Sequence, residues 1–238
     1  MGLQEQEKRF QDTAREIIEF GYPEPLWQLV KNFSLQYLEK GRVNFDIPHT
    51  RGTVDWVFRL ATDYNQKVES GEIPDGVPVD VIVLVTAAWP HDIGYYGEFD
   101  EEASLSQVGD KKARHMAVGA EMAGRFLREH AADYLSQNQI IQVVNLDKVH
   151  DNLDHIESVP EKILLEADTL GAMDVSWVEP TYKGVEALNY LVRERMQKRY
   201  DLFITPLGLE SLQVIRGNFE QFIINRDFGG IPPGSIQE

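Results

Sequence analysis

The stretch VDVIVLVTAAWPHDIG, residues 79–94, is the most apolar run of the chain and ends in an adjacent histidine and aspartate, His91 and Asp92. Apolar residues fill nearly every position up to Trp89, so periodicity alone fits both a buried helix and a buried strand. We predict a helix over about 79–89, because alanines dilute the β-branched residues and the neighbouring segments have helical spacing.

His91 and Asp92 are neighbours, so on a regular helix their side chains would point about 100° apart. Pro90 and Gly94 flank the pair and predict a distorted helix end at this point. Such a distortion would let both side chains reach one metal ion.

Outward from this stretch, apolar residues recur at helical spacing through most of the chain, separated by glycine, proline and polar runs. Ser158, with Glu161 three residues later, predicts a capping box at the start of one helix. Residues 94–109 are expected to form a polar loop. The expected helices cover about residues 10–18, 24–40, 49–68, 79–89, 112–130, 137–152, 158–173, 184–199 and 207–225. The predicted fold class is all-α, with no sheet beyond a stray hairpin.

The chain has 238 residues, of which 42% are hydrophobic and 26% charged, a balance typical of a globular protein with a sizeable core. We find no internal repeat or linker and expect residues 1–238 to form one domain. The absence of cysteine excludes disulfides, thiolate zinc sites and cysteine nucleophiles. The first residues do not resemble a signal peptide, and the longest apolar run is too short to span a bilayer, so a cytoplasmic location is expected.

The formal net charge is −16, from 23 lysines and arginines against 39 aspartates and glutamates. A field of this sign repels the phosphates of nucleic acids and of anionic membranes, so neither is an expected partner. A small phosphate substrate remains compatible, because a metal ion and a few basic residues can neutralise its charge locally. The expected partner is therefore a small phosphorylated molecule, and a homodimer is compatible with the sequence.

Four histidines and two aspartates are the candidate metal ligands. They are His49, His91, Asp92, His115, His150 and Asp168. Imidazole nitrogen and carboxylate oxygen together suit zinc, iron, manganese, nickel or cobalt, and such a mixed set is typical of a hydrolytic metal centre. His130 and His155 are interpreted as ordinary residues, because they fall near predicted helix ends or in polar loops.

The contexts of these residues resemble those of a known family, the HD-domain superfamily of metal-dependent phosphohydrolases. The matching segments, in the family's order, are Asp46–His49, Ala87–Gly94, Arg114–Ala120, Val143–His150 and Leu164–Ala172. A histidine–aspartate pair alone is a weak signal, whereas five ordered elements are a strong one. The resemblance spans about residues 46–173 and implies a helical bundle with the metal centre in its core, completed by N- and C-terminal helices.

The resemblance also implies the role of each candidate ligand. His49, His91, Asp92 and Asp168 match the positions that hold one metal ion. His115 and His150 match the extra histidines of binuclear members, in which Asp92 would bridge to a second ion. Asp92, His115 and His150 are accordingly the residues expected to act in catalysis. The cofactor would be one or two divalent ions, and the sequence does not distinguish manganese, iron, cobalt, nickel, zinc and magnesium.

The function that this resemblance implies is hydrolysis of a nucleotide or another small phosphate ester or anhydride by a metal-activated water. A di-iron oxygenase is one alternative, since some members with six such ligands use oxygen, and a non-enzymatic sensor or scaffold is another. Arg51, Lys112 and Arg114 lie near predicted ligands in the sequence and are the candidate substrate contacts. A later basic stretch, Arg193, Arg195, Lys198 and Arg199, is interpreted first as a surface face and second as a phosphate site.

Overall fold

The computed structural model describes residues 3–42, 44–96, 105–179, 183–189 and 196–233, and of residues 3 and 105–113 it gives only the helical backbone. The helices are α1 (Leu3–Glu19), α2 (Glu24–Leu38), α3 (Asp46–Glu69), α4 (Val81–Ala88), α5 (Leu105–His130), α6 (Gln137–Val149), α7 (Val159–Met173), α8 (Gly184–Ala187), α9 (Gln197–Tyr200) and α10 (Pro206–Phe228). Two short 3-10 helices, η1 (Ile93–Tyr95) and η2 (Leu153–His155), complete the set. These described ranges contain no strand, which confirms the all-α prediction.

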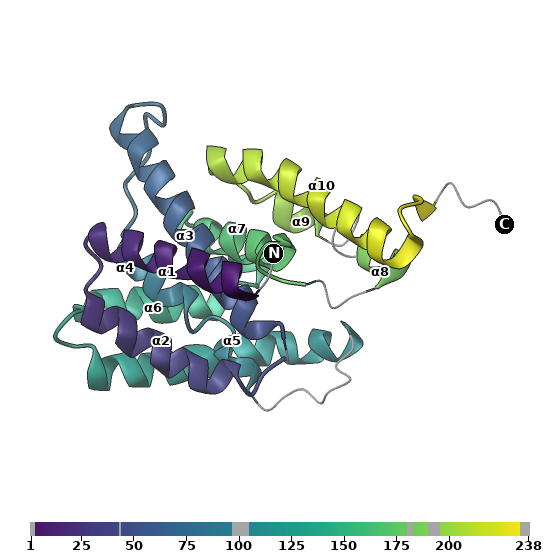
Figure 1. The fold of residues 1–238 in the computed structure, drawn as a ribbon. Helices are drawn as coiled ribbons and strands as arrows, with labels where there is room; N and C mark the ends of the chain where they lie inside the picture. Colours follow the sequence, from purple (N-terminus) through teal and green to yellow (C-terminus); the bar gives the residue numbers. More distant parts are fainter. Residues whose placement is uncertain (1–2, 43, 97–104, 180–182, 190–195, 234–238) are drawn as a thin grey trace.

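The helices are arranged around α3 and α7, which lie between two outer groups. Figure 1 shows α10 along one side of the molecule and α5 with α6 on the opposite side. The main hydrophobic core runs through these layers and draws buried residues from Phe10 in α1 to Ile224 in α10. The one-domain organisation of residues 1–238 stays a prediction. None of the described helices is long and apolar enough to cross a membrane.

Helix α4 is buried on nearly all sides, which explains why its sequence has no polar face. Asp80 begins the helix, because its Oδ1 accepts a hydrogen bond from the backbone N–H of Val83 at 3.1 Å. A helix satisfies its backbone hydrogen bonds internally and can therefore lie in the core without a partner strand. The choice of helix over strand for this segment is confirmed.

The contact between α3 and α7 depends on Gly171. A Cβ atom at this position would lie 2.8 Å from the backbone nitrogen of Thr53 in α3, so no larger residue fits without a shift. The close approach brings His49 of α3 beside Asp168 of α7. Helix α7 starts with the predicted capping box at Ser158.

A second close approach places η1 against α5. A Cβ atom at Gly94 would lie 1.9 Å from the backbone oxygen of His115, so only glycine is compatible with this packing. The turn that follows His91 and Asp92 is thereby fixed on the helix that carries His115.

Two expected boundaries are wrong. Helix α5 begins at Leu105, so the loop expected over 94–109 extends too far, although residues 97–104 lie outside the described ranges. The polar run Gly109–Lys112 interrupts the apolar spacing after Leu105 and Val108, so the periodic pattern becomes clear only at about residue 112. The single helix expected over 184–199 is described as α8 and α9 instead, with residues 190–195 outside the described part.

Candidate metal centre

His49 enters the centre from the first turn of α3. Its backbone N–H donates to the carbonyl oxygen of Phe45 at 2.9 Å, which ties the residue to the helix start. The imidazole stacks on the Phe45 ring with centroids 5.1 Å apart and is only 2% exposed. Helix geometry and aromatic packing therefore direct this side chain into the bundle.

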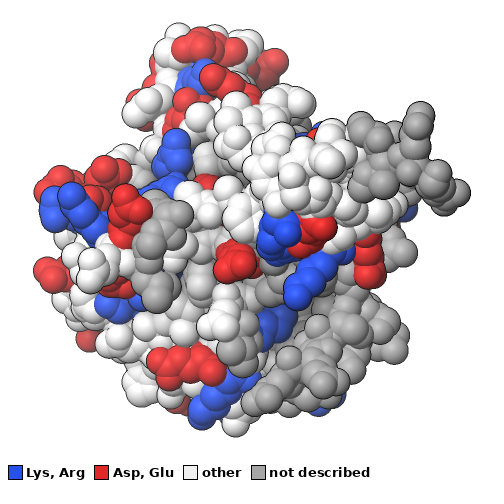
Figure 2. Space-filling view, turned by 45° about the vertical axis from the view of Figure 1, so that its right-hand side comes forward, with Lys and Arg blue, Asp and Glu red and all other residues white. Residues whose placement is uncertain are grey.

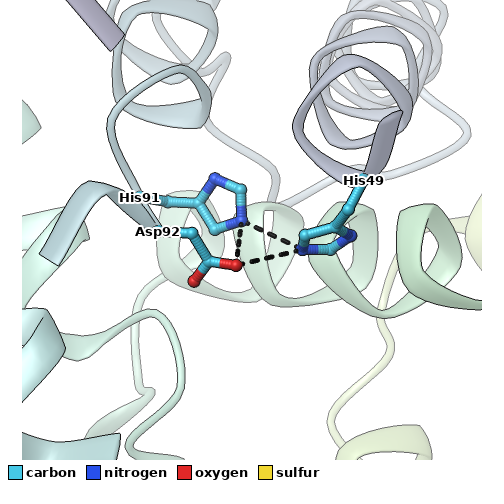
Figure 3. A group of neighbouring side chains, drawn as sticks. All are labelled: His49, His91 and Asp92. Atoms are coloured by element: carbon cyan, nitrogen blue, oxygen red, sulfur yellow. Dashed lines mark hydrogen bonds and ion pairs between the residues drawn. The ribbon is translucent and has the colours of Figure 1, made fainter. Parts of the chain in front are cut away.

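His91 and Asp92 follow the end of α4 in a turn, as the flanking Pro90 and Gly94 had indicated. Asp92 has φ −106° and ψ 2°, outside the regular helical range, so the pair is not separated by the helical rotation. Both residues are buried, and Figure 3 shows their side chains meeting that of His49 between the helices.

A first group of ligand atoms forms around the Nε2 atoms of His49 and His91, which lie 3.2 Å apart. Asp92 Oδ2 lies 3.5 Å from the His49 nitrogen and 3.6 Å from the His91 nitrogen. Asp168 Oδ1 completes the group at 3.0 and 3.6 Å from the same two nitrogens. The structure thus brings together the four residues that the sequence assigns to one ion.

A second group forms on the other side of Asp92. Its Oδ1 atom lies 3.5 Å from His115 Nε2 and 3.8 Å from His150 Nε2, and these two nitrogens are 3.3 Å apart. Each oxygen of Asp92 therefore faces one pair of histidines. This is the arrangement that a carboxylate bridging two ions requires.

The spacing of these atoms fits metal coordination. Nitrogen and oxygen ligands about 2.0–2.2 Å from a shared ion lie roughly 2.8–3.6 Å apart at tetrahedral or octahedral angles. Seven of the eight distances within the two groups, including 3.2 Å between His49 and His91 and 3.3 Å between His115 and His150, fall within this range. The eighth, 3.8 Å between Asp92 Oδ1 and His150 Nε2, exceeds it by 0.2 Å.

The outer ring nitrogens of His91 and His150 indicate which tautomer these two histidines adopt, whereas those of His49 and His115 have no hydrogen-bond partner among the described residues. His91 Nδ1 donates to the carbonyl oxygen of Ala88 at 2.8 Å, and His150 Nδ1 donates to that of Asp147 at 2.8 Å. A proton fixed on Nδ1 leaves the lone pair of Nε2 directed at the centre, as metal-binding histidines require. The donor set of the centre therefore fits a divalent ion.

Electrostatics keep the two carboxylates ionised. Burial opposes the charge of Asp92, but His91 and Arg42 hold the pKa of its carboxyl well below the usual range. Burial likewise opposes the charge of Asp168, and Arg199 holds its pKa well below the usual range. Both side chains are therefore anionic at neutral pH, as metal ligands would need to be.

The pKa values of His91 and His115 are shifted in opposite directions. Burial tends to lower the pKa of His91, yet the Asp92 carboxylate beside it raises the value to about 9. For His115, burial and then repulsion from His150 lower the pKa to about 3. His115 is therefore a neutral nitrogen donor, whereas His91 in the metal-free centre holds a proton that an incoming cation would displace.

Sequence reasoning missed Arg42, which contacts the centre from the segment before α3. Its Nη2 donates to Asp92 Oδ2 at 2.7 Å, and its Nε donates to Asp46 Oδ1 at 2.6 Å. The guanidinium packs over the rings of Phe45 and Tyr95, 4.4 and 4.6 Å from their centroids. Nothing in the sequence distinguishes it from an exposed arginine, because its contacts depend on chain segments that only the fold brings together.

Arg199 corrects the interpretation of the later basic stretch as a surface face. Its side chain is buried, and its guanidinium donates to both Asp168 and Asp151. Lys198 beside it is exposed, as the interpretation expected, while Arg193 and Arg195 lie outside the described residues. The short helix α9 turns Arg199 inward, so adjacent basic residues have opposite environments.

The three candidate substrate contacts are placed differently. Arg51 donates to Glu7 of α1 at 2.8 Å and lies over the ring of Phe10, 4.9 Å from its centroid. Arg114 is exposed on α5, and the side chain of Lys112 lies outside the described residues. Their role toward a substrate stays a prediction.

The remaining two histidines behave as the sequence indicated, because His130 and His155 are both exposed and are absent from the two ligand groups of the described chain.

Comparison with known proteins gives one positive result. A family model described as "HD domain" matches residues 47–175, which is more than half of the chain and includes all six candidate ligands. Neither the curated proteins nor the solved structures gave a match.

Proposed function

The chain belongs to the HD-domain family, and from this premise we propose that it is a metal-dependent phosphohydrolase. We infer that it cleaves a nucleotide or another small phosphate ester or anhydride. The observation that supports this most is the placement of Asp92, whose two oxygens each face one pair of buried histidines.

The residues divide into two metal positions. His49, His91, Asp92 and Asp168 would hold one divalent ion, and Asp92, His115 and His150 would hold a second. Bound ions of this kind lower the pKa of a coordinated water toward neutrality and polarise a phosphoryl oxygen.

The surrounding residues contribute by fixing the ligands and by restricting water. Tyr95 stacks on the His115 ring with centroids 3.8 Å apart, which holds that imidazole in one orientation. The four histidines are at most 2% exposed and Asp92 is 5% exposed, whereas the Asp168 side chain, at 13%, is the most accessible of the six candidate ligands. A small, dry centre strengthens the attraction between bound ions and a phosphate.

A compact substrate agrees with the charge of the molecule. The net charge of −16 opposes a long polyanion. Figure 2 shows basic side chains in a narrow diagonal band with acidic side chains beside it, rather than a broad basic surface. We therefore propose a small phosphorylated molecule as the substrate, without a nucleic-acid or membrane partner.

The test is hydrolysis by the purified chain after chelation and reloading. Release of phosphate or pyrophosphate is measured on a panel of nucleotides and phosphate esters with manganese, cobalt, nickel or magnesium. We expect turnover that needs the metal and that His91→Ala abolishes. The matched control is His130→Ala, which removes an exposed imidazole outside the centre and should retain activity.

Two outcomes would overturn the proposal. Oxygen uptake by the iron-loaded protein, without hydrolysis of any panel compound, would identify the di-iron oxygenase. Tight metal binding without either reaction would favour the non-enzymatic sensor or scaffold.

A further inference from the structure

Arg199 is the residue through which α9 reaches the metal centre. It is 6% exposed, and three of its nitrogens are engaged. Nη2 donates to Asp168 Oδ2, Nη1 donates to Asp151 Oδ1, and Nε donates to Thr169 Oγ1 at 2.8 Å. The contact with Asp168 joins residues 31 positions apart in the sequence.

The two oxygens of Asp168 have different partners. Oδ1 lies 3.0 Å from His49 Nε2 and 3.6 Å from His91 Nε2, whereas Oδ2 accepts from Arg199. Arg199 therefore contacts the oxygen that faces away from the histidines. By contrast, Arg42 contacts Asp92 Oδ2, the same oxygen that faces His49 and His91, and does not separate the two oxygens of its partner.

The guanidinium is itself held in place. The hydroxyl of Thr169 donates to the carbonyl oxygen of Leu165 at 2.7 Å, which leaves its lone pairs for Arg199 Nε. Asp151, in the turn after α6, accepts from Nη1 of Arg199 and so fixes a second nitrogen of the guanidinium. Because the nitrogens of arginine lie in one rigid plane, fixing two of them determines where the third one points.

We propose that Arg199, held by Asp151 and Thr169, is a positioning residue for Asp168. It takes one carboxylate oxygen and thereby turns the other toward the ion held by His49 and His91. This inference rests on the proposed metal centre and deepens it, because it assigns a single-oxygen mode of coordination to Asp168.

A purely electrostatic role of Arg199 predicts the opposite change in metal affinity. If Arg199 only neutralised a buried carboxylate, its removal would take away a positive charge and would tighten the binding of a cation. If Arg199 positions Asp168, its removal frees the ligand and weakens metal binding, typically by about 10–100-fold for a lost ligand-orienting partner.

The experiment titrates Co²⁺ into the chelator-treated full chain and records both the dissociation constant and the visible spectrum. The variants are Arg199→Gln, Arg199→Lys and Asp151→Asn. Lys198→Gln is the matched control, because it removes the same charge from the adjacent exposed position. Circular dichroism establishes that each variant is folded.

We expect Arg199→Gln to bind Co²⁺ about 10–100-fold more weakly and with an altered spectrum. Arg199→Lys, which keeps the charge but loses the planar fork, should restore binding only in part. Asp151→Asn should weaken binding by less than Arg199→Gln, and Lys198→Gln should match the wild type. If Arg199→Gln does not fold, the Co²⁺ affinities of Arg199→Lys and Asp151→Asn test the positioning role instead.

Several results would overturn the inference. Unchanged or tighter binding by Arg199→Gln, or full recovery by Arg199→Lys, would reduce Arg199 to charge neutralisation while leaving the metal centre intact. An equal loss in Lys198→Gln would assign the effect to net charge. Failure of the wild-type chain to bind Co²⁺ would instead overturn the metal centre and the inference together.

Discussion

Glu166 and Asp168 lie two residues apart on α7, and the protein stabilises the buried carboxylate of Glu166 and the partly buried one of Asp168 in different ways. Glu166 accepts hydrogen bonds from the backbone N–H groups of Ile204 and Thr205, at 2.5 and 3.0 Å, and from the Thr205 hydroxyl. Asp168 faces the guanidinium of Arg199 and the imidazoles of His49 and His91 in the candidate metal centre.

The two environments have different electrostatic results. Burial raises the pKa of Glu166 to about 7, and neutral hydrogen-bond donors reverse this only in part. Burial also acts to raise the pKa of Asp168, but the positive charge of Arg199 holds that pKa well below the usual range. A residue that anchors α10 can bind in either protonation state, whereas a metal ligand must stay ionised.

The largest expected effect comes from changing each carboxyl to its amide. Asp168→Asn removes an anionic ligand and should lower hydrolytic activity by more than about 100-fold, beyond the typical loss for an indirect partner. Glu166→Gln keeps a side-chain oxygen that accepts from the backbone N–H groups of Ile204 and Thr205, and should retain activity within about twofold. Steady-state assays at saturating metal measure both. Equal losses in the two variants would contradict the distinction between ligand and anchor.

Metal removal sharpens the same comparison through stability. A ligand present at about 100 times its dissociation constant stabilises the folded state by about 2.7 kcal/mol. For a chain of this size that corresponds to roughly 5–11 °C in melting temperature. We expect thermal melts of wild type and Glu166→Gln to rise by this amount with metal, and the melt of Asp168→Asn to rise little. A full rise in Asp168→Asn would remove Asp168 from the ligand set.

The pH dependence of stability should isolate Glu166. Its pKa is about 7 in the folded state against 4.5 as the ordinary value, so folding favours the protonated form. Its contribution is complete below about pH 4.5 and is lost as the pH rises through about 7. The free energy of unfolding of the wild type, relative to Glu166→Gln, should therefore fall between pH 5 and pH 8. Parallel pH profiles of the two proteins would refute this.

The smallest expected effect is at Thr205, which caps α10. Its hydroxyl accepts from the backbone N–H of Gly208 at 3.0 Å and donates to Glu166. Thr205→Ala should cost about 1 kcal/mol, as typical for a lost helix cap. The melting temperature should then drop by roughly 2–4 °C, with metal binding unchanged. Thr205→Ser keeps the hydroxyl and serves as the control. A loss of metal binding in Thr205→Ala would contradict the separation between the Glu166 contact and the metal centre at Asp168.

Much of the helical fold was predictable because helices leave local marks. The capping box at Ser158 and the buried apolar run of α4 are both read within a few neighbouring residues. The start of α5 was placed too late, because the polar run Gly109–Lys112 interrupts the apolar spacing after Leu105 and Val108. Local patterns therefore predicted which segments are helical better than where they begin.

The candidate ligands were predictable for a different reason. His91 and Asp92 are adjacent, and the small and apolar residues around them, like those around His49 and Asp168, carry a family pattern that survives without any knowledge of the fold. Residue type, order and context were sufficient to select six side chains that the structure brings together.

The sequence by itself determined the residue types, the helical segments and the family. Only the tertiary structure decided that Asp92 faces a pair of histidines with each oxygen and that Arg42, half-buried, and Arg199, buried, donate to the candidate ligands. It also decided that Glu166 binds the start of α10 and no cation of the centre. The physical reason is the separation in sequence over which each interaction acts. Helix signals act over three or four residues, whereas these charges meet across tens of positions and acquire their partners only when helix packing excludes water.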